Sequence, residues 1–342
     1  MEMIPIFVTA LNAVGPVVLL ILLGYLLKQS GFISSDFVRM GNKLVFNVCL
    51  PCMLFINVYD IDGFSAINWD IVIYCVAMLL VIFALGYFAS VLVTNVPQRR
   101  GVIWQCTFRS NFAIIGLSLA GALGGEEAVA VAAIVSSFTV PLFNILAVIA
   151  LSMFVKTGSE KKTDYRAILR NIAKNPLIIA VALGLICLVI REIQVMYFGS
   201  AVFTLKHQGK LLYTSLNNLK AIASPFALLV LGGQFEFSAV KGLMKEIAAG
   251  TIWRIVLAPL LGIGGAIVLS RFAGILNCGV NEYPALVAMF GSPVAVSSAV
   301  MAGSMGGDEQ LATQLVVWTS LLSILTIFAQ VCILMSIGLL TV

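Results

Sequence analysis

The sequence predicts an all-α polytopic membrane protein, with ten transmembrane helices in two inverted five-helix repeats and broken crossover helices 4 and 9. Three observations lead to this prediction. The chain is 61% hydrophobic and only 10% charged, with a mean hydropathy of +1.08, whereas a soluble domain has about 25% charged residues. Apolar runs of about 20 residues, long enough to cross a bilayer, recur along the chain. Two of these runs are interrupted in the same way, at matching positions in the two halves of the chain.

Ten apolar segments follow one another along the chain. In order, they are expected to cover residues 5–27, 37–59, 69–94, 102–122, 127–155, 176–195, 211–232, 245–270, 282–303 and 310–339. A hydrophilic stretch, 156–175, divides them into a first half (1–155) and a second half (176–342) with five spans each. Because five is odd, the second half must enter the membrane upside down relative to the first, which predicts an inverted-topology repeat joined by a cytoplasmic linker.

The distribution of Lys and Arg predicts the orientation. If the N-terminus lies outside, the inner segments hold 13 of these residues and the outer segments hold 5, while Arg109 and Arg254 fall within spans. Cytoplasmic loops carry an excess of Lys and Arg, so both termini are expected outside a plasma membrane. The net charge of +5 comes mostly from these inner loops and does not indicate a nucleic-acid partner.

The two interruptions occupy corresponding positions in the two halves. Gly291 in the second half corresponds to Gly116 in the first. Pro293 corresponds to Ser118 at the same separation along the chain. Pro225 corresponds to Pro51 at almost the same separation. Paired interruptions of this kind indicate an internal repeat with a binding site near the middle of the membrane. This is the pattern of a secondary transporter.

Each interruption is expected to create a new helix N-terminus. Gly116 removes a side chain from the helix and Ser118 can cap the helix that follows, while Pro293 lacks an N–H and clashes with the preceding turn. The two half-helix N-termini would approach each other, with unpaired N–H groups and positive dipole ends facing one gap. Two such ends predict a site for an anion.

Polar residues near the first interruption add to this site. The Asn111 amide can donate to a carboxylate, although a hydrogen bond between packed spans is the alternative. Arg109 is either a counter-charge for an anionic substrate or a side chain that snorkels to the cytoplasmic surface. Arg254 is closer to the inner end of its span and is expected to snorkel.

The composition also excludes several functions. All 15 Asp and Glu residues fall in loops or at span ends, whereas cation exchangers generally place a carboxylate within the membrane. The single histidine, His207, lies in a loop, and neither metal-ligand spacing nor a phosphate-binding loop occurs. We therefore expect no enzymatic activity, no cofactor and no metal.

Four stretches together resemble the auxin efflux carrier family, which includes the plant PIN-FORMED auxin exporters and bacterial relatives associated with malonate and malate. They are Asn42–Pro51, Asn111–Ser118, Ser292–Ala295 and Pro225–Gly232. The resemblance covers essentially the whole chain. The family usually has proline where this chain has Ser118.

The resemblance implies a scaffold of spans 1, 2, 6 and 7, a transport unit of spans 3–5 and 8–10, and a homodimer joined through the scaffold. It also implies elevator-like movement and a substrate-binding role for Asn111, with Gly116, Leu117 and Pro293 lining the crossover. With the residues argued above, the candidate substrate-binding set is Arg109, Asn111, Gly116, Leu117, Ser118, Ser292, Pro293 and Pro51. Neutral residues that could set substrate size are Leu50, Cys52, Ser136 and Ser297.

The sequence thus predicts a secondary active transporter of small organic anions, such as malonate, malate or auxin-like acids, that works by alternating access. A sodium-coupled organic anion symporter of the bile-acid type is the first alternative. A non-transporting membrane sensor that binds a carboxylate is the second, and a channel is the third.

Overall fold

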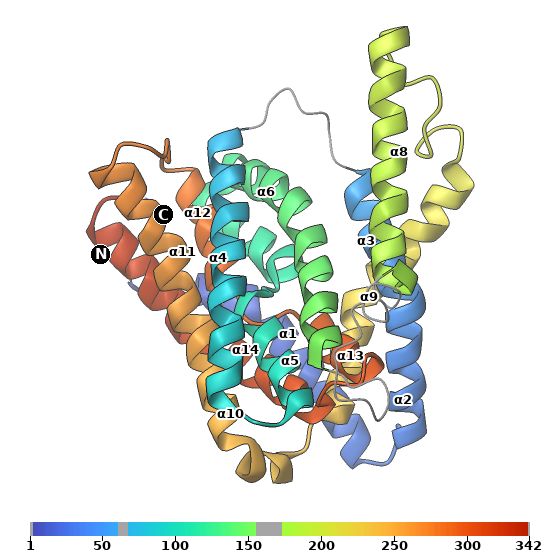
Figure 1. Ribbon diagram of the computed structural model, residues 1–342, viewed down its shortest axis with the longest axis vertical. Coiled ribbons are helices and arrows are strands. Elements are labelled where there is room, and N and C mark those ends of the chain that lie inside the picture. Colours follow the sequence, from blue (N-terminus) through green and yellow to red (C-terminus); the bar gives the residue numbers. More distant parts are fainter. Residues whose placement is uncertain (1–2, 61–67, 155–172, 341–342) are drawn as a thin grey trace.

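A computed structural model describes residues 3–60, 68–154 and 173–340, and this part of the chain consists of helices joined by loops and short extended segments (Figure 1). The predicted linker, 156–175, lies mostly outside the described residues. Seven helical segments are long and apolar enough to cross a membrane. They are Ser35–Tyr59, Trp69–Val93, Phe112–Phe154, Pro176–Phe198, Lys210–Gln234, Phe237–Phe272 and Glu309–Ser336. The predictions of an all-helical fold and of a polytopic membrane protein are therefore confirmed.

Three differences from the ten expected spans account for the smaller number. In the first helix, Met3–Gln29, the fully described apolar stretch is Val14–Gln29, which is shorter than a full span by this criterion. The expected spans 102–122 and 127–155 contribute one long segment, since α6 (Leu117–Phe154) continues across a kink at Gly124 and Gly125. The expected span 282–303 is divided into short helices.

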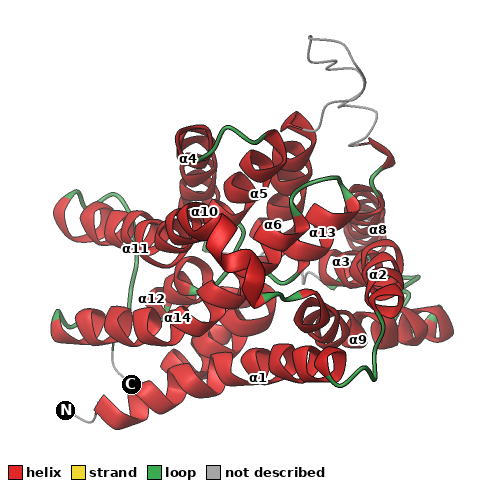
Figure 2. Ribbon diagram, turned by 90° about the horizontal axis from the view of Figure 1, so that it is seen from below, coloured by secondary structure: helices red, strands yellow, loops and turns green. Residues whose placement is uncertain are grey.

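The first group of helices, called the scaffold group here, is joined through α9, which packs against α1, α2 and α3, and through α3, which packs against α8. It comprises α1 (Met3–Gln29), α2 (Ser35–Leu44), the π-helical turn η1 (Val45–Cys49), α3 (Leu50–Tyr59), α8 (Pro176–Phe198) and α9 (Lys210–Gln234). In both views α2, α3, α8 and α9 lie on the right (Figures 1 and 2). A Cβ at Gly24 would overlap the carbonyl of Leu229, and one at Gly232 would overlap that of Ile21. Small residues thus let the backbones of α1 and α9 approach closely.

The second group contains both broken helices and is called the crossover group. It comprises α4 (Trp69–Val93), α5 (Pro97–Phe108), η3 (Phe112–Gly116), α6, η4 (Phe237–Ala239), α10 (Val240–Ile252), η5 (Trp253–Leu257), α11 (Ala258–Ile267), η6 (Val268–Phe272), α12 (Glu282–Leu286), η7 (Val287–Gly291), α13 (Ser297–Ser304) and α14 (Glu309–Ser336). Helices α4, α10, α11 and α12 lie on the left in both views (Figures 1 and 2). The scaffold helix α1 runs beside α14.

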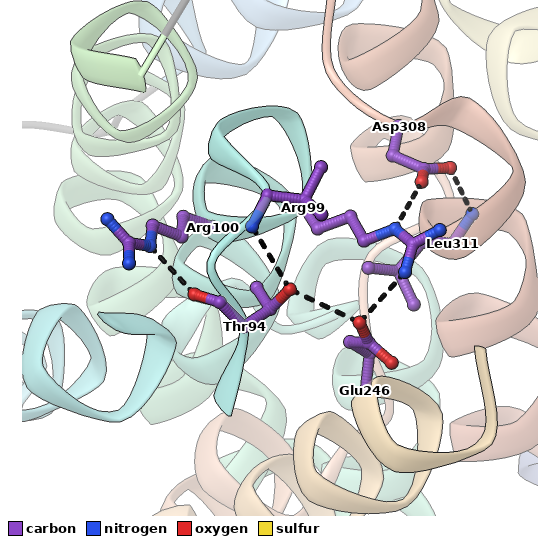
Figure 3. Close-up of polar contacts among 7 residues, drawn as sticks. Thr94, Arg99, Arg100, Glu246, Asp308 and Leu311 are labelled. Atoms are coloured by element: carbon purple, nitrogen blue, oxygen red, sulfur yellow. Dashed lines mark hydrogen bonds and ion pairs between the residues drawn. The ribbon is translucent and has the colours of Figure 1, made fainter. Parts of the chain in front are cut away.

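One polar cluster joins several helices of the crossover group (Figure 3). Arg99 of α5 binds Glu246 of α10 at 2.9 Å and Asp308, the N-cap of α14, at 3.0 Å. Thr94, which ends α4, donates its hydroxyl to Glu246 at 3.2 Å. Four helices are therefore tied together within this one group.

Two glycine pairs lie where a helical segment kinks, at Gly124 and Gly125, or has just ended, at Gly306 and Gly307. Gly125 has a φ of +67° and Gly306 a φ of +76°, a conformation that glycine adopts without a Cβ clash. Asp308 then caps α14 by accepting a hydrogen bond from the N–H of Leu311 at 3.0 Å. These glycines and acids therefore serve helix termination and capping.

The start of α1 and the end of α14 lie side by side. The rings of Phe7 and Phe328 are 5.9 Å apart and nearly perpendicular. The two ends of the chain therefore reach the same side of the molecule.

Candidate functional site

Two extended segments cross each other at the centre of the crossover group. The N–H of Asn111 donates to the carbonyl of Pro293 at 2.8 Å, and the N–H of Ala295 donates to the carbonyl of Arg109 at 3.2 Å. Ser110 and Val294 form the antiparallel bridge between these bonds. Non-helical backbone at membrane depth must find partners within the protein. Here each broken helix supplies them to the other.

The first break lies earlier than the sequence analysis predicts. Helix α5 ends at Phe108, and Arg109 is already extended, with φ −81° and ψ 104°. Helical structure resumes at Phe112 and continues through Gly116 into α6. The prediction that Gly116 and Ser118 break the helix is therefore wrong, because the backbone opens where it can pair with the second crossing segment.

Gly116 and Ser118 have other roles. A Cβ at Gly116 would overlap the Phe112 ring and approach the Ala288 carbonyl to 2.8 Å. Gly116 thus allows η3 to pack against η7. Ser118 is exposed, and its hydroxyl donates back to the carbonyl of Ile114 at 3.5 Å, so it does not cap the helix.

The second break lies where the sequence predicts it. Turn η7 ends at Gly291, and Ser292 is extended with φ −63° and ψ 148°. The buried Ser292 hydroxyl donates to the carbonyl of Ala288 at 2.6 Å. Pro293 contributes its carbonyl to the crossing, while the N–H of Val294 donates to the Thr319 hydroxyl at 3.1 Å.

A small cavity, called the central cavity here, lies between the crossing and the scaffold group. Its volume is about 40 Å³, which is room for about three water molecules. Its lining residues are Leu50, Met53, Leu54, Arg109, Ser110, Asn111, Ala113, Ile114, Val140, Phe143, Asn144, Ala223, Ser224, Ala227, Ala295, Val296 and Ser297. The cavity is therefore bounded by both helix groups.

Arg109 is a buried cation with neutral partners. Its side chain is only 3% exposed, which excludes snorkelling to the surface. One guanidinium nitrogen donates to the Asn144 oxygen at 2.6 Å and another contacts the sulfur of Met301. Among the described residues, no carboxylate lies within ion-pair distance of it. A buried charge without a counter-ion is costly, and an anion in the cavity would supply one.

Two neutral groups beside Arg109 are also available to a ligand. The side-chain nitrogen of Asn111 and the hydroxyl of Ser110 are buried without a hydrogen-bond partner, and Asn111 is 3% exposed. Buried polar groups without partners are uncommon in folded proteins. Both residues line the central cavity, so a cation and two hydrogen-bonding groups converge on one space.

Both half-helix N-termini reach the same cavity. Asn111 precedes η3, and Ser297 is the first residue of α13. Ala113 and Ser297, at the two helix starts, both line the cavity. The first N–H groups of a helix have no partner within it and carry partial positive charge. The geometry therefore adds two positive helix ends to the charge of Arg109.

The remaining predicted residues lie next to the cavity without lining it. Pro51 follows the lining residue Leu50 in the chain. Leu117, the first residue of α6, comes one turn after the lining residue Ile114 of η3. Of the four neutral candidates for substrate size, Leu50 and Ser297 line the cavity, whereas Cys52 and Ser136 do not.

Sequence reasoning did not identify Ser110, Asn144 and Ser224 as cavity residues. Asn144 sits in a long apolar run, and its own amide nitrogen donates to the Val140 carbonyl at 2.7 Å. This bond leaves its oxygen free for Arg109. An isolated Asn within an expected span is a usable signal, because polar groups in a membrane are costly unless they have partners.

Arg254 does not snorkel, contrary to the prediction. It is 1% exposed and belongs to η5. Its guanidinium donates to five backbone carbonyls at 2.7 to 3.4 Å. These are the carbonyls of Thr107, Phe108, Met289, Phe290 and Ser292. The side chain therefore joins the ends of both half-helices that precede the crossing.

A wider cavity of about 530 Å³ is called the vestibule here. It is lined by Lys28, Ser35, Val38, Arg39, Asn42, Lys43, Phe46, Asn47, Gly233, Gln234, Glu236, Gly303, Ser304, Glu309 and Gln310. On α2–α3, on α9 and on α13, residues that line the vestibule lie a few positions along the chain from residues that line the central cavity. The vestibule thus lies on one side of the central cavity and carries three basic side chains.

Comparisons with known proteins agree with a membrane carrier. The model of a family described as "Membrane transport protein" matches residues 9–329. An uncharacterized transporter of Methanothermobacter thermautotrophicus is 24% identical over 331 residues, covering 94% of this chain and 97% of that protein. An uncharacterized transporter of Methanocaldococcus jannaschii is 24% identical over 248 residues, covering 71% of this chain and 74% of that protein.

Proposed function

This chain belongs to the membrane transport protein family, the auxin efflux carrier family, and from this premise we propose that it is a secondary active transporter of small organic anions. The central cavity is its substrate site. The observation that carries the proposal is Arg109, a buried guanidinium with neutral partners, beside the unpartnered Asn111 amide and Ser110 hydroxyl. A carboxylate accepts hydrogen bonds from all three groups and neutralises the charge.

The size of the cavity supports small carboxylates as substrates. A space of about 40 Å³ is far below the roughly 300–1,000 Å³ that drug-sized ligands occupy. Malonate and malate are therefore favoured over a larger auxin-like acid, and each of these acids is larger than about three water molecules, so binding requires the cavity to widen toward the vestibule. Leu50 and Met53 supply apolar walls from the scaffold group, and Ser224 adds a hydroxyl.

The proposed mechanism is elevator-type alternating access. The crossover group carries the substrate between its two half-helix starts and slides past the scaffold group. Two inverted repeats, 1–155 and 176–342, supply the two groups, and the protein forms a homodimer through the scaffold group in the plasma membrane. Lys28, Arg39 and Lys43 line the vestibule and belong to the basic side of the chain. This side is cytoplasmic by the positive-inside rule, so the conformation described here faces inward.

The test is exchange in proteoliposomes. The purified protein is reconstituted, and uptake of labelled malonate, malate and indole-3-acetate is measured against the same unlabelled acid inside. Saturable exchange is expected for at least one acid, with a loss of at least about tenfold in Asn111→Ala, equivalent to about 1.4 kcal/mol. Asn218→Ala, at an exposed position of α9, is the matched control and is expected to behave as wild type.

Other outcomes would contradict the proposal in distinguishable ways. Binding of an acid without exchange would favour a sensor. Uptake that neither saturates nor shows counterflow would favour a channel. Exchange that survives Asn111→Ala and Arg109→Gln would keep the transport function but remove the central cavity as its site.

A further inference from the structure

The five carbonyls bound by Arg254 form what we call the carbonyl cage: Thr107 and Phe108 from the end of α5, Met289 and Phe290 from η7, and Ser292 just after it. A guanidinium has five N–H donors. The Nε atom donates to Ser292 at 3.0 Å, and each terminal nitrogen donates to two carbonyls of one half-helix, at 3.4 and 3.2 Å in α5 and at 3.1 and 2.7 Å in η7. Arg254 therefore satisfies all its donors with backbone oxygens from both broken helices.

The charge of Arg254 is balanced by helix ends. Among the described residues, no carboxylate lies within ion-pair distance of this guanidinium. The last carbonyls of a helix have no partner within it and carry partial negative charge. Two such ends meet at Arg254, whereas the two positive ends meet at the central cavity beside Arg109. The crossing is thus divided into a cation-binding side and an anion-binding side.

Carriers with broken helices commonly bind their coupling cation at such a place, through unwound carbonyls and half-helix C-termini. We propose that the Arg254 guanidinium is a tethered cation that permanently fills this position, so that the transport cycle runs without a sodium ion. The transport part of this inference rests on the proposed function, whereas the occupation of the cage by a cation does not. A cation site filled by Arg254 would also distinguish this chain from a sodium-coupled symporter, whose site must be open to sodium.

The first test uses the wild-type protein in proteoliposomes. Exchange of the transported acid is measured with sodium chloride, and again with choline chloride at the same ionic strength on both sides. The rates are expected to agree within about twofold, a difference of about 0.4 kcal/mol. Exchange that requires sodium would overturn the inference while leaving the anion transport function in place.

The second test needs no substrate. The melting temperature of Arg254→Ala is measured in choline chloride, in sodium chloride and with guanidinium at a concentration that leaves wild type unaffected. An emptied carbonyl cage is expected to bind the small cations, so guanidinium or sodium raises the melting temperature of the variant relative to choline, by mass action on the folded state. Arg271→Ala is the control, since exposed Arg271 caps a single carbonyl, that of Ile337.

A folded Arg254→Ala protein with the same melting temperature in all three salts would overturn the inference. If this variant does not fold, Arg254→Lys and Arg254→Gln separate charge from hydrogen bonding. Lysine keeps the positive charge, whereas glutamine keeps only neutral donors. Arg254→Lys is expected to melt above Arg254→Gln. Equal melting temperatures for the two would contradict a cation site, and they would do so even if no acid were transported.

Discussion

Two buried arginines dominate the chemistry at the level of single side chains. Arg109 faces the central cavity with neutral partners, and Arg254 faces the carbonyl cage with all five donors used. Both are buried within the protein, and Arg109 lines the central cavity together with Ser110 and Asn111, whose side-chain polar groups lack partners. The same residue type therefore organises backbone at Arg254, whereas at Arg109 we propose that it binds a ligand.

Replacing Arg109 tests the role of its charge. Arg109→Gln removes the charge while retaining an amide that can contact Asn144, so we expect the apparent affinity for the acid to fall at least about tenfold. Arg109→Lys keeps the charge but loses the planar fork, and an intermediate affinity is expected. The measurement is the substrate concentration that gives half-maximal exchange. Arg100→Gln is the control, and an unchanged affinity in Arg109→Gln would exclude Arg109 from the site.

Removing the partner of Arg109 tests how the guanidinium is held. In Asn144→Leu one buried donor group of Arg109 loses its acceptor, which costs about 1–3 kcal/mol of folding stability. Malonate is expected to recover part of this loss, because a ligand that binds only the folded state stabilises it. The melting temperature with and without malonate measures both effects. A variant as stable as wild type without ligand would show that the Asn144 bond contributes little.

Among the helices, the two breaks are stabilised by each other and by close packing. Asn111 and Pro293 share a hydrogen bond across the crossing, and η3 packs against η7 where Gly116 leaves room beside the Ala288 carbonyl. Each half-helix thus depends on a segment in the opposite half of the chain. A change in packing between η3 and η7 should therefore affect the site as a whole.

A pair of glycine substitutions tests this packing. Gly116→Ala introduces a methyl group that overlaps Phe112 and approaches a fixed carbonyl, so a cost of about 1–3 kcal/mol is expected. Gly242→Ala is the matched control, because α10 is open there and nothing lies within 4 Å of the added Cβ. Its effect should be neutral or slightly stabilising. Melting temperatures of the two variants decide the point, and equal values would contradict a packing role for Gly116.

At the scale of the whole molecule, hydrogen bonds cross the boundary between the two helix groups beside the vestibule. Glu309 of α14 accepts hydrogen bonds from Asn42 of α2 and from Gln234 of α9. Under the proposed elevator motion these bonds hold the inward-facing state and must break in each cycle. The Arg99 cluster, in contrast, lies within the crossover group and should persist (Figure 3).

Cross-linking distinguishes these two kinds of contact. In a variant without native cysteines, Asn42→Cys with Glu309→Cys places two thiols across the group boundary. Oxidation is expected to abolish exchange, and a reductant should restore it. The control pair is Thr94→Cys with Glu246→Cys, which replaces a contact within the crossover group at 3.2 Å. Exchange that continues while the first pair is cross-linked would contradict a sliding movement between the groups.

Much of the fold is a local property of the chain and was therefore predictable. Long apolar runs determine a polytopic helical protein, and the break at Pro293 follows from a missing N–H. The choice of Arg109 and Asn111 as candidate site residues follows from the cost of polar groups at membrane depth. The family, which the comparisons confirm, could be identified from short stretches around the two breaks.

The tertiary structure alone decided where the first break lies and what Arg254 does. Arg109 and Asn111 leave the helix because they pair with Pro293 and Ala295, and no local feature of sequence encodes such a distant partner. Arg254 stays buried because five carbonyls from two other helices surround its guanidinium. Whether an arginine snorkels or remains inside depends on what its far end meets, which only the packing of distant segments determines.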